Sequence, residues 1–146
     1  MKRYSIREAS QYSGLPSSTL RYYETVGILD PVGRDASSGH RVYTQDDLTT
    51  LEAVSCLNAS GLTLEEMRTY LQNRTRGVEG AKDQVRLLTA QRDRLEAERA
   101  QLELRLAYVN WKVQFWEAWA RDDQDEVERT GAEAEEVAQS LKHTRR

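Results

Sequence analysis

Apolar residues spaced alternately three and four apart run from residue 85 to residue 116. Eight of the ten positions are apolar and two are arginines: Val85, Leu88, Arg92, Leu95, Arg99, Leu102, Leu106, Val109, Val113 and Trp116. This spacing is typical of a coiled-coil seam. At ~1.5 Å per residue such a helix is about 48 Å long, too long for the rest of the chain to cover. The seam therefore predicts a homodimer, with an intrachain hairpin to the C-terminal segment as the alternative.

Composition excludes several classes of protein. Charged residues make up 31% of the 146 residues and hydrophobic residues 38%, which suits a small domain carrying long, half-exposed helices. No apolar run is long enough for a membrane helix, so we expect a cytoplasmic protein that does not contact membranes. One cysteine, Cys56, and two histidines, His40 and His143, leave too few ligands for a structural zinc site. We expect no metal and no cofactor.

The N-terminal residues predict two short helices joined by a tight turn. Ser5 and Glu8 have the spacing of a capping box, which starts a helix that ends before Gly14. A second helix begins at Ser17 and runs to about Val26. Two short helices around a glycine turn form a helix-turn-helix, whose second helix enters a major groove of DNA.

The following residues predict a β wing and two more helices. The segment from Asp30 to Tyr43 is rich in turn residues and reads as a hairpin around Ser37–Gly39. Thr44 caps a third helix that ends near Gly61, and Thr63 opens a fourth that runs to about Asn73. Residues 73–80, which contain two glycines, read as a short linker. The predicted fold is mainly α: a winged helix-turn-helix followed by a long coiled-coil helix.

Four ordered motifs resemble those of the MerR family of bacterial transcription regulators. They are the run Thr19-Leu20-Arg21-Tyr22-Tyr23-Glu24, then Gly27-Ile28-Leu29, then Gly39-His40-Arg41-Val42-Tyr43, and finally Gly61-Leu62-Thr63-Leu64-Glu65-Glu66-Met67. The motifs cover residues 4–73. Residues 80–116 resemble the family only in being a long helix with coiled-coil spacing. The resemblance implies a DNA-binding domain over 1–76, an antiparallel coiled-coil dimerisation helix over 80–119, and an acidic tail over 120–146 that is partly disordered or a short helix.

The resemblance also implies a mechanism. Members of the family bind a pseudo-palindromic promoter site as dimers and distort the DNA spacer, so that RNA polymerase engages both promoter elements. The net charge of the chain is −3, but residues 1–44 hold six basic residues against four acidic ones. A DNA-facing surface near the N-terminus is therefore compatible with the acidic total.

The residues expected to contact DNA lie on the second helix, in the wing and at the start of the fourth helix. Arg21 can bind a guanine edge or a phosphate, and hydroxyl groups at the start of the second helix suit a phosphate. Tyr43 has ordinary core packing as its alternative role. The full set is Ser17, Ser18, Arg21, Tyr22, Arg34, Arg41, Tyr43 and Thr63.

Two places could sense a small-molecule effector. Cys56, five residues before Gly61, resembles the single cysteine of the aldehyde- and electrophile-responsive branch of the family, although Glu52 one turn earlier disfavours a thiolate. Burial as a small core residue is the alternative for Cys56. Metal sensing through cysteines after the dimerisation helix is excluded, because residues 57–146 contain none.

The second place is an aromatic cluster near the end of the dimerisation helix. Trp111, Trp116 and their neighbours Tyr108, Phe115 and Trp119 could bind an aromatic or cationic ligand, or could clasp the DNA-binding domain of a partner. No motif of an enzyme is present, so an enzyme is not expected. A coiled-coil adaptor without DNA specificity is the alternative of another class, and an excisionase-like architectural protein is disfavoured by the long helix.

Overall fold

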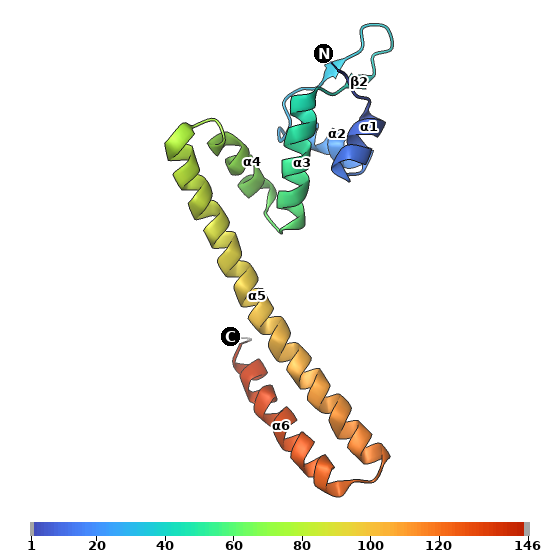
Figure 1. Ribbon diagram of the computed structural model, residues 1–146, viewed down its shortest axis with the longest axis vertical. Coiled ribbons are helices and arrows are strands. Elements are labelled where there is room, and N and C mark those ends of the chain that lie inside the picture. The colour runs from blue at the N-terminus through green and yellow to red at the C-terminus, as the bar shows by residue number, and fades with distance from the viewer. Residues whose placement is uncertain (1, 145–146) are drawn as a thin grey trace. The chain divides into compact units, whose positions relative to one another are not determined.

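The computed structural model describes residues 2–144 and contains six helices and one two-stranded sheet within them (Figure 1). The elements are α1 (Ile6–Ser13), α2 (Ser17–Thr25), β1 (Gly33–Arg34), β2 (Arg41–Val42), α3 (Gln45–Ala59), α4 (Leu64–Asn73), α5 (Gly77–Ala120) and α6 (Gln124–His143). Residues 1–91 and 92–146 form two compact units, with the boundary inside α5. The predicted fold class, mainly helical with a winged helix-turn-helix and a long helix, is confirmed.

The first unit packs α1, α2, α3 and α4 around one hydrophobic core. The core is made of residues such as Leu20, Tyr43, Leu48, Leu51 and Val54, all at most 1% exposed. Capping boxes at Ser5, Thr44 and Thr63 begin α1, α3 and α4, because each side chain accepts a hydrogen bond from the third residue of its helix. The capping boxes therefore define where these three helices begin and stabilise their first turns.

The turn between α1 and α2 holds the helix-turn-helix together. Gly14 has φ +74°, a left-handed conformation that a side chain would strain. Ser10 Oγ donates to the carbonyl oxygen of Leu15 at 2.6 Å, which ties α1 to the chain entering α2.

The wing is an antiparallel hairpin with Gly33 opposite Val42 and Arg34 opposite Arg41. A bridge between Tyr4 and Tyr43 attaches it to the N-terminal segment. The Asp35 carboxylate accepts hydrogen bonds from the backbone N–H and the hydroxyl of both Ser37 and Ser38. Chiefly because of the Ser37 hydroxyl, these bonds hold the pKa of Asp35 well below its usual value.

The expected linker over residues 73–80 is shorter than predicted. Helix α5 already begins at Gly77, and Gly80 is a buried residue inside it. A Cβ at Gly80 would lie 2.0 Å from the carbonyl oxygen of Asn73, so glycine here allows α5 to pack against the end of α4. The Gln84 side chain joins the same helices by donating to the carbonyl oxygen of Tyr70.

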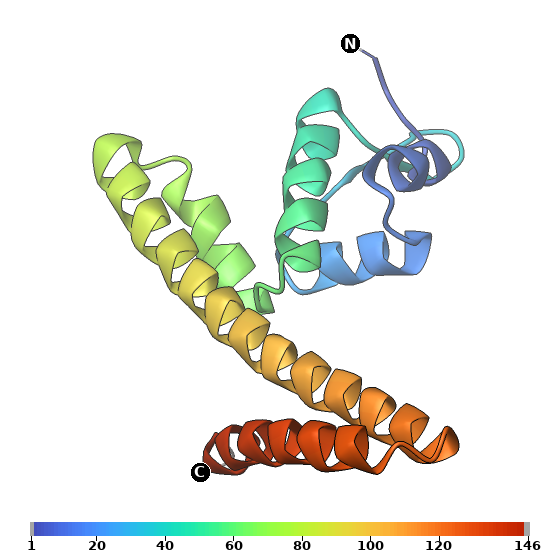
Figure 2. The ribbon, with the colours of Figure 1, turned by 60° about the horizontal axis from the view of Figure 1, so that its bottom comes forward.

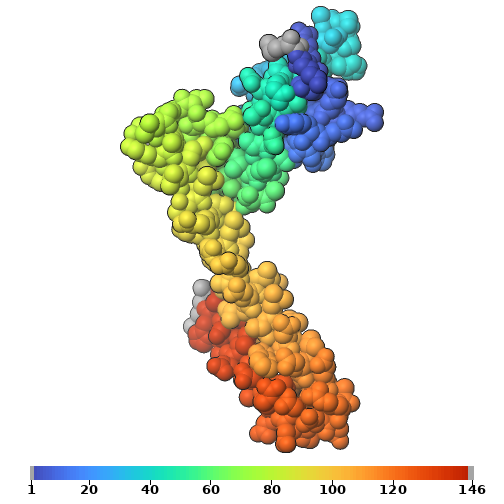
Figure 3. Space-filling model, viewed as in Figure 1, coloured from blue at the N-terminus to red at the C-terminus, as the bar shows by residue number. Residues whose placement is uncertain are grey.

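The second unit is an antiparallel helical hairpin, in which α6 lies along the C-terminal part of α5 (Figure 2). Of the two alternatives expected for the tail, a partly disordered segment or a short helix, residues 124–143 form a helix, which is 20 residues long. Arg129 lies 5.8 Å from the Trp111 ring centroid, and a Cβ at Gly131 would lie 3.2 Å from the Phe115 ring. The space-filling view shows α6 against the surface of α5 (Figure 3).

The seam of α5 stays exposed although α6 packs on the same helix. Side chains from Val85 to Trp116 along the seam are between 42% and 65% exposed where they are apolar. Helix α6 instead packs on the side that carries Trp111, Phe115 and Ala118, of which Ala118 is fully buried. These residues occupy heptad positions on the side of α5 away from the seam. The intrachain hairpin therefore forms and leaves the seam open.

Candidate nucleic-acid interface

The first turn of α2 begins the candidate interface. Pro16 precedes it and makes no side-chain capping hydrogen bond, so no capping side chain occupies the N–H groups of the first turn. Ser18 is exposed and Ser17 is half-buried. Helix N-termini with free N–H groups favour phosphate oxygens. The two predicted serines therefore stand where a phosphate can approach.

Arg21 and Tyr22 follow on the outer face of α2. Arg21 is exposed, and Tyr22 is 51% exposed with its ring centroid 6.0 Å from that of Tyr23. Tyr23 and Leu20 turn inward and are buried. The inward pair fixes the helix on the core and leaves the outward pair free to contact a ligand.

Four arginines from three elements converge on one hollow beside α2. Arg7 comes from α1, Arg21 from α2, and Arg34 and Arg41 from the wing. With Ser5, Ile6 and His40 they line a space of about 330 Å³. Sequence reasoning missed Arg7 and His40, because their places beside Arg21 depend on how α1 and the wing pack against α2. A concentration of guanidinium groups is the electrostatic footprint expected of a phosphate-binding surface.

Glu24 joins α2 to the wing. Its carboxylate accepts from Arg41 Nε at 2.7 Å and from the backbone N–H of Val32 at 3.0 Å. Burial raises the pKa of Glu24, but these hydrogen bonds and the charge of Arg41 outweigh it and hold the pKa below its usual value. Arg41 thus has a structural bond on one side while it lines the hollow on the other. Arg34 donates to the carbonyl oxygen of Gly39 at 2.9 Å and stays exposed.

Tyr43 and Thr63 of the predicted set do not line the arginine-lined hollow. Tyr43 is fully buried, so its assignment to the DNA surface is corrected: the ring belongs to the core, and burial raises the pKa of the phenol. Its hydroxyl has no hydrogen-bond partner within the described residues. Thr63 is exposed, and its hydroxyl oxygen accepts from the N–H of Glu66 at 3.2 Å. Its side chain thus caps α4, away from the arginine-lined hollow.

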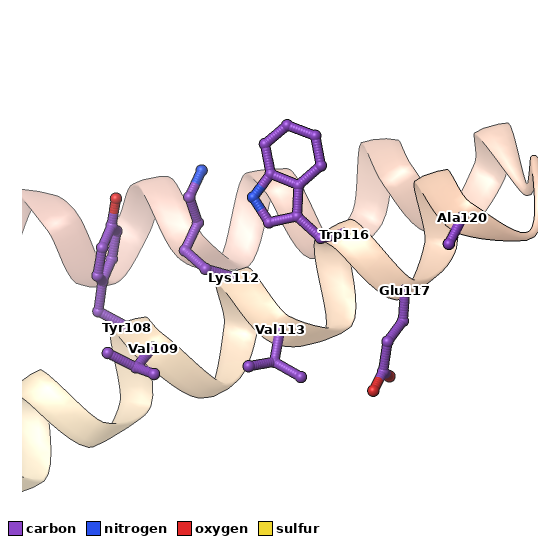
Figure 4. A pocket seen from close by; sticks show the side chains of 7 residues that line it. All are labelled: Tyr108, Val109, Lys112, Val113, Trp116, Glu117 and Ala120. Carbon is purple, nitrogen blue, oxygen red and sulfur yellow. The ribbon is translucent and has the colours of Figure 1, made fainter.

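The structure separates the residues predicted to sense an effector. Cys56 is exposed in the last turns of α3, which corrects the alternative of a buried core residue. Trp111 is half-buried beside Arg129 of α6, whereas Trp116 is 61% exposed. Trp116 lines a hollow of about 520 Å³ on the surface of α5 with residues that include Val109 and Val113 of the seam (Figure 4). Trp111 and Trp116 thus do not form one pocket.

Within residues 2–144, no cluster of three or more potential metal ligands occurs, and none of the helices is long and apolar enough to cross a membrane.

Comparisons with known proteins agree with this geometry. Residues 4–74 match the model of the MerR HTH family regulatory protein. The regulator AdhR of Bacillus subtilis is 34% identical over 62% of this chain, and the match spans 64% of AdhR, slightly less than two thirds of its length. An HTH-type transcriptional regulator of Haemophilus influenzae is 27% identical over 78% of this chain and 84% of its own.

A solved structure extends the likeness to the long helix. HiNmlR, described as a MerR family regulator lacking the sensor domain and bound to promoter DNA, superimposes with a TM-score of 0.68. The alignment covers 86% of this chain and 96% of HiNmlR at 26% identity. Residues 4–74 thus resemble the MerR HTH family in sequence, and the order of helix-turn-helix, wing and long helix is similar to that of HiNmlR.

Proposed function

We propose that this chain binds promoter DNA as a homodimer and controls transcription by distorting the DNA spacer so that RNA polymerase engages both promoter elements. The hollow lined by Arg7, Arg21, Arg34 and Arg41 carries the DNA-binding part of this proposal. HiNmlR, which shares the fold, is bound to promoter DNA. In this arrangement α2 enters the major groove, and the wing arginines contact the flanking phosphates.

The homodimer is supported by the exposed seam on α5. Leu88, Leu95, Leu102, Leu106 and Val109 are between 42% and 55% exposed, although α6 packs on another side of the same helix. We propose an antiparallel coiled coil of two copies over residues 80–119, with the exposed hollow at Trp116 filled by the partner. Arg92 and Arg99, which pair with acids of their own helix, then face acids of the second copy and fix its register.

Replacing Arg21 with alanine tests the DNA contact. The probe is the promoter region upstream of the protein's own gene, and binding is measured by fluorescence anisotropy at several salt concentrations. Loss of a base contact costs about 1–3 kcal/mol, so Arg21→Ala should weaken binding by roughly 5- to 150-fold for each half-site. Wild-type affinity should fall steeply with salt because phosphate contacts dominate.

Arg86→Ala is the matched control for Arg21→Ala. Arg86 pairs with Asp83 in the first turns of α5, outside the arginine-lined hollow, and its loss should leave promoter binding unchanged. A dimer that binds this promoter no better than unrelated DNA, with a flat salt response, would support the adaptor alternative and refute promoter recognition.

We further propose that Cys56 senses a reactive aldehyde or another electrophile. Its support is the exposure of Cys56 in α3, one turn before Ser60, whose N–H and hydroxyl donate to the Cys56 carbonyl oxygen. The thiolate sulfur forms a bond to the aldehyde carbon, the C=O π electrons move to oxygen, and that oxygen takes a proton from water. The adduct alters the end of α3, from which the chain turns into α4.

In vitro transcription with formaldehyde tests this assignment. Wild-type protein should change transcription from its promoter when the aldehyde is added, and Cys56→Ser should bind the same DNA without responding. An equal response of both proteins would remove Cys56 from the mechanism.

A further inference from the structure

Seven basic residues of the second unit fall into two groups. Arg92, Arg99, Arg121 and Arg129 each form an ion pair with a nearby carboxylate. Three others, Arg105, Lys112 and Lys142, lie in no ion pair within residues 2–144. Lys112 instead lies 6.0 Å from the Tyr108 ring centroid and 4.7 Å from that of Phe115. The cations without carboxylate partners thus gather around Tyr108.

Two of these cations border a hollow between α5 and α6. Arg105 and Tyr108 of α5 line it together with Ala138, Leu141 and Lys142 of α6, around a space of about 400 Å³. Its apolar lining comes from Tyr108, Ala138 and Leu141, and none of its lining residues is acidic. Lys142 in the last turn of α6 also complements the helix dipole. That effect does not act on Arg105, which lies in the middle of the neighbouring helix α5.

The hollow differs from the surfaces assigned above in most of its lining. It shares no residue with the arginine-lined hollow beside α2, none of the apolar seam positions, and Tyr108 alone with the hollow at Trp116. The exposed hollow at Trp116 lies on the seam side of α5 and includes Glu117 (Figure 4). The hollow at Arg105 instead has Ala138, Leu141 and Lys142 of α6 in its lining.

We propose that this hollow binds a small aromatic carboxylate. The aromatic ring lies against Tyr108, Ala138 and Leu141, and the carboxylate accepts hydrogen bonds from Arg105 and Lys142. Small-molecule sites are typically apolar hollows of this size with a few placed polar groups. Charge-assisted hydrogen bonds from a guanidinium select a carboxylate over a neutral or cationic group. The cationic ligand suggested by the aromatic cluster is disfavoured here, because the charges at the rim are positive.

Binding of 2-naphthoate to the full-length protein, measured by isothermal titration calorimetry, tests the proposal. The same rings are supplied with a neutral group as 2-naphthalenemethanol and with a positive one as 2-naphthylmethylammonium. We expect the carboxylate to bind with one site per chain, the alcohol about tenfold more weakly, and the cation more weakly still. Equal affinity of carboxylate and alcohol, or no saturable binding of the carboxylate, would overturn the site.

Variants of the two cations locate the binding. Arg105→Gln and Lys142→Gln should each weaken naphthoate binding about fivefold or more and leave the affinity for the alcohol nearly unchanged. Arg121→Gln, at an ion-paired arginine outside the hollow, is the control and should bind like wild type. All three side chains are exposed, so far-ultraviolet circular dichroism should show unchanged helix content. Full naphthoate binding by the Arg105→Gln/Lys142→Gln double variant would contradict the assignment.

Ligand binding is measured without DNA, so it stands apart from promoter recognition. A role for the carboxylate as an effector, by contrast, rests on the proposed function and is tested by repeating the promoter titration with saturating naphthoate. Absence of promoter binding by the unliganded wild type would count against the proposed function alone. Absence of naphthoate binding would count against this site alone.

Discussion

The two units of the chain bury their apolar residues in different ways. Residues 1–91 enclose a continuous core that includes Leu20, Tyr43 and Leu51 and begin three helices with capping boxes. Within residues 92–144, the buried hydrophobic residues are Ala118 and Ala134, while leucines, valines and tryptophans of α5 stay exposed. The first unit therefore buries its apolar residues within one chain, whereas the second leaves an apolar seam exposed.

This difference matches the two proposed activities, DNA binding and dimerisation, to two different kinds of surface. The proposed DNA surface of the first unit is polar and rests on a closed hydrophobic core, and the bond from Arg41 to Glu24 joins the wing to α2. The seam of the second unit is apolar and rimmed by charge, which is typical of an interaction surface. A substitution in the core of the first unit should change the folding stability of each chain by itself. A substitution in the seam should change the stability of the dimer.

The largest expected effect comes from a charge in the seam. Leu95→Asp would bury an uncompensated carboxylate in each copy, at a cost of about 3–5 kcal/mol. The dimer dissociation constant should rise by at least two orders of magnitude, and the monomer should bind a half-site only weakly. Sedimentation velocity across a concentration series measures this change.

Ala97→Asp is the control for Leu95→Asp, because it places the same charge on the same helix at an exposed position outside the seam. It should remain dimeric at concentrations where Leu95→Asp is monomeric. If Leu95→Asp sedimented as a dimer, the seam would not be the interface and the contrast between the units would fail.

A core truncation gives the next largest effect. Leu51 is fully buried, so Leu51→Ala should lower the free energy of unfolding by about 3 kcal/mol through lost contacts and a cavity. Leu102, 51% exposed, has few contacts to lose in one chain, and Leu102→Ala should act mainly through the dimer. Thermal melts at several protein concentrations separate the two.

The destabilisation by Leu51→Ala should be similar at every concentration, because it concerns one chain. That of Leu102→Ala should depend on concentration, because coupling to dimerisation follows mass action. Equal concentration dependence for both variants would show that the first unit is not stable without its partner.

The sequence predicts the first unit better than the second for a physical reason. Capping residues such as Ser5, Thr44 and Thr63 act on the first turn of their own helix, so their effect is local and visible in the sequence. The seam is equally visible because its period is regular. Arg7 and His40 were missed at the arginine-lined hollow because their positions depend on how α1 and the wing pack beside α2.

Helix α6 was underestimated because its buried side is made of small residues. Thr130 and Ala134 are its buried residues, and charged residues cover the exposed face. Threonine and alanine are only weakly hydrophobic, so they do not mark the buried side of the helix clearly in the sequence. The many charged residues then make the segment look solvent-exposed. Tyr43 was assigned to the surface for a different reason: the motif places it two residues after Arg41, on the same face of an ideal strand. Strand β2 ends at Val42, and Tyr43, bridged to Tyr4, packs its ring in the core.

The smallest expected effect concerns the bond between α2 and the wing. At neutral pH, Glu24→Gln removes the charge that accepts hydrogen bonds from Arg41 and Val32 and should lower the stability of the first unit by about 1 kcal/mol. The pKa of Glu24 is lowered in the folded state. Its contribution is therefore fully present above the unfolded pKa and is lost as the pH falls through the folded pKa.

The difference in melting temperature between wild type and Glu24→Gln should accordingly be largest near pH 7 and shrink as the solution is acidified below about pH 4. Glu128→Gln, at an exposed glutamate of α6, is the control and should melt like wild type throughout. A difference that stayed constant with pH would mean that the Glu24 side chain acts through its shape rather than its charge. The wing would then be held by the backbone hairpin and the Tyr4–Tyr43 bridge alone.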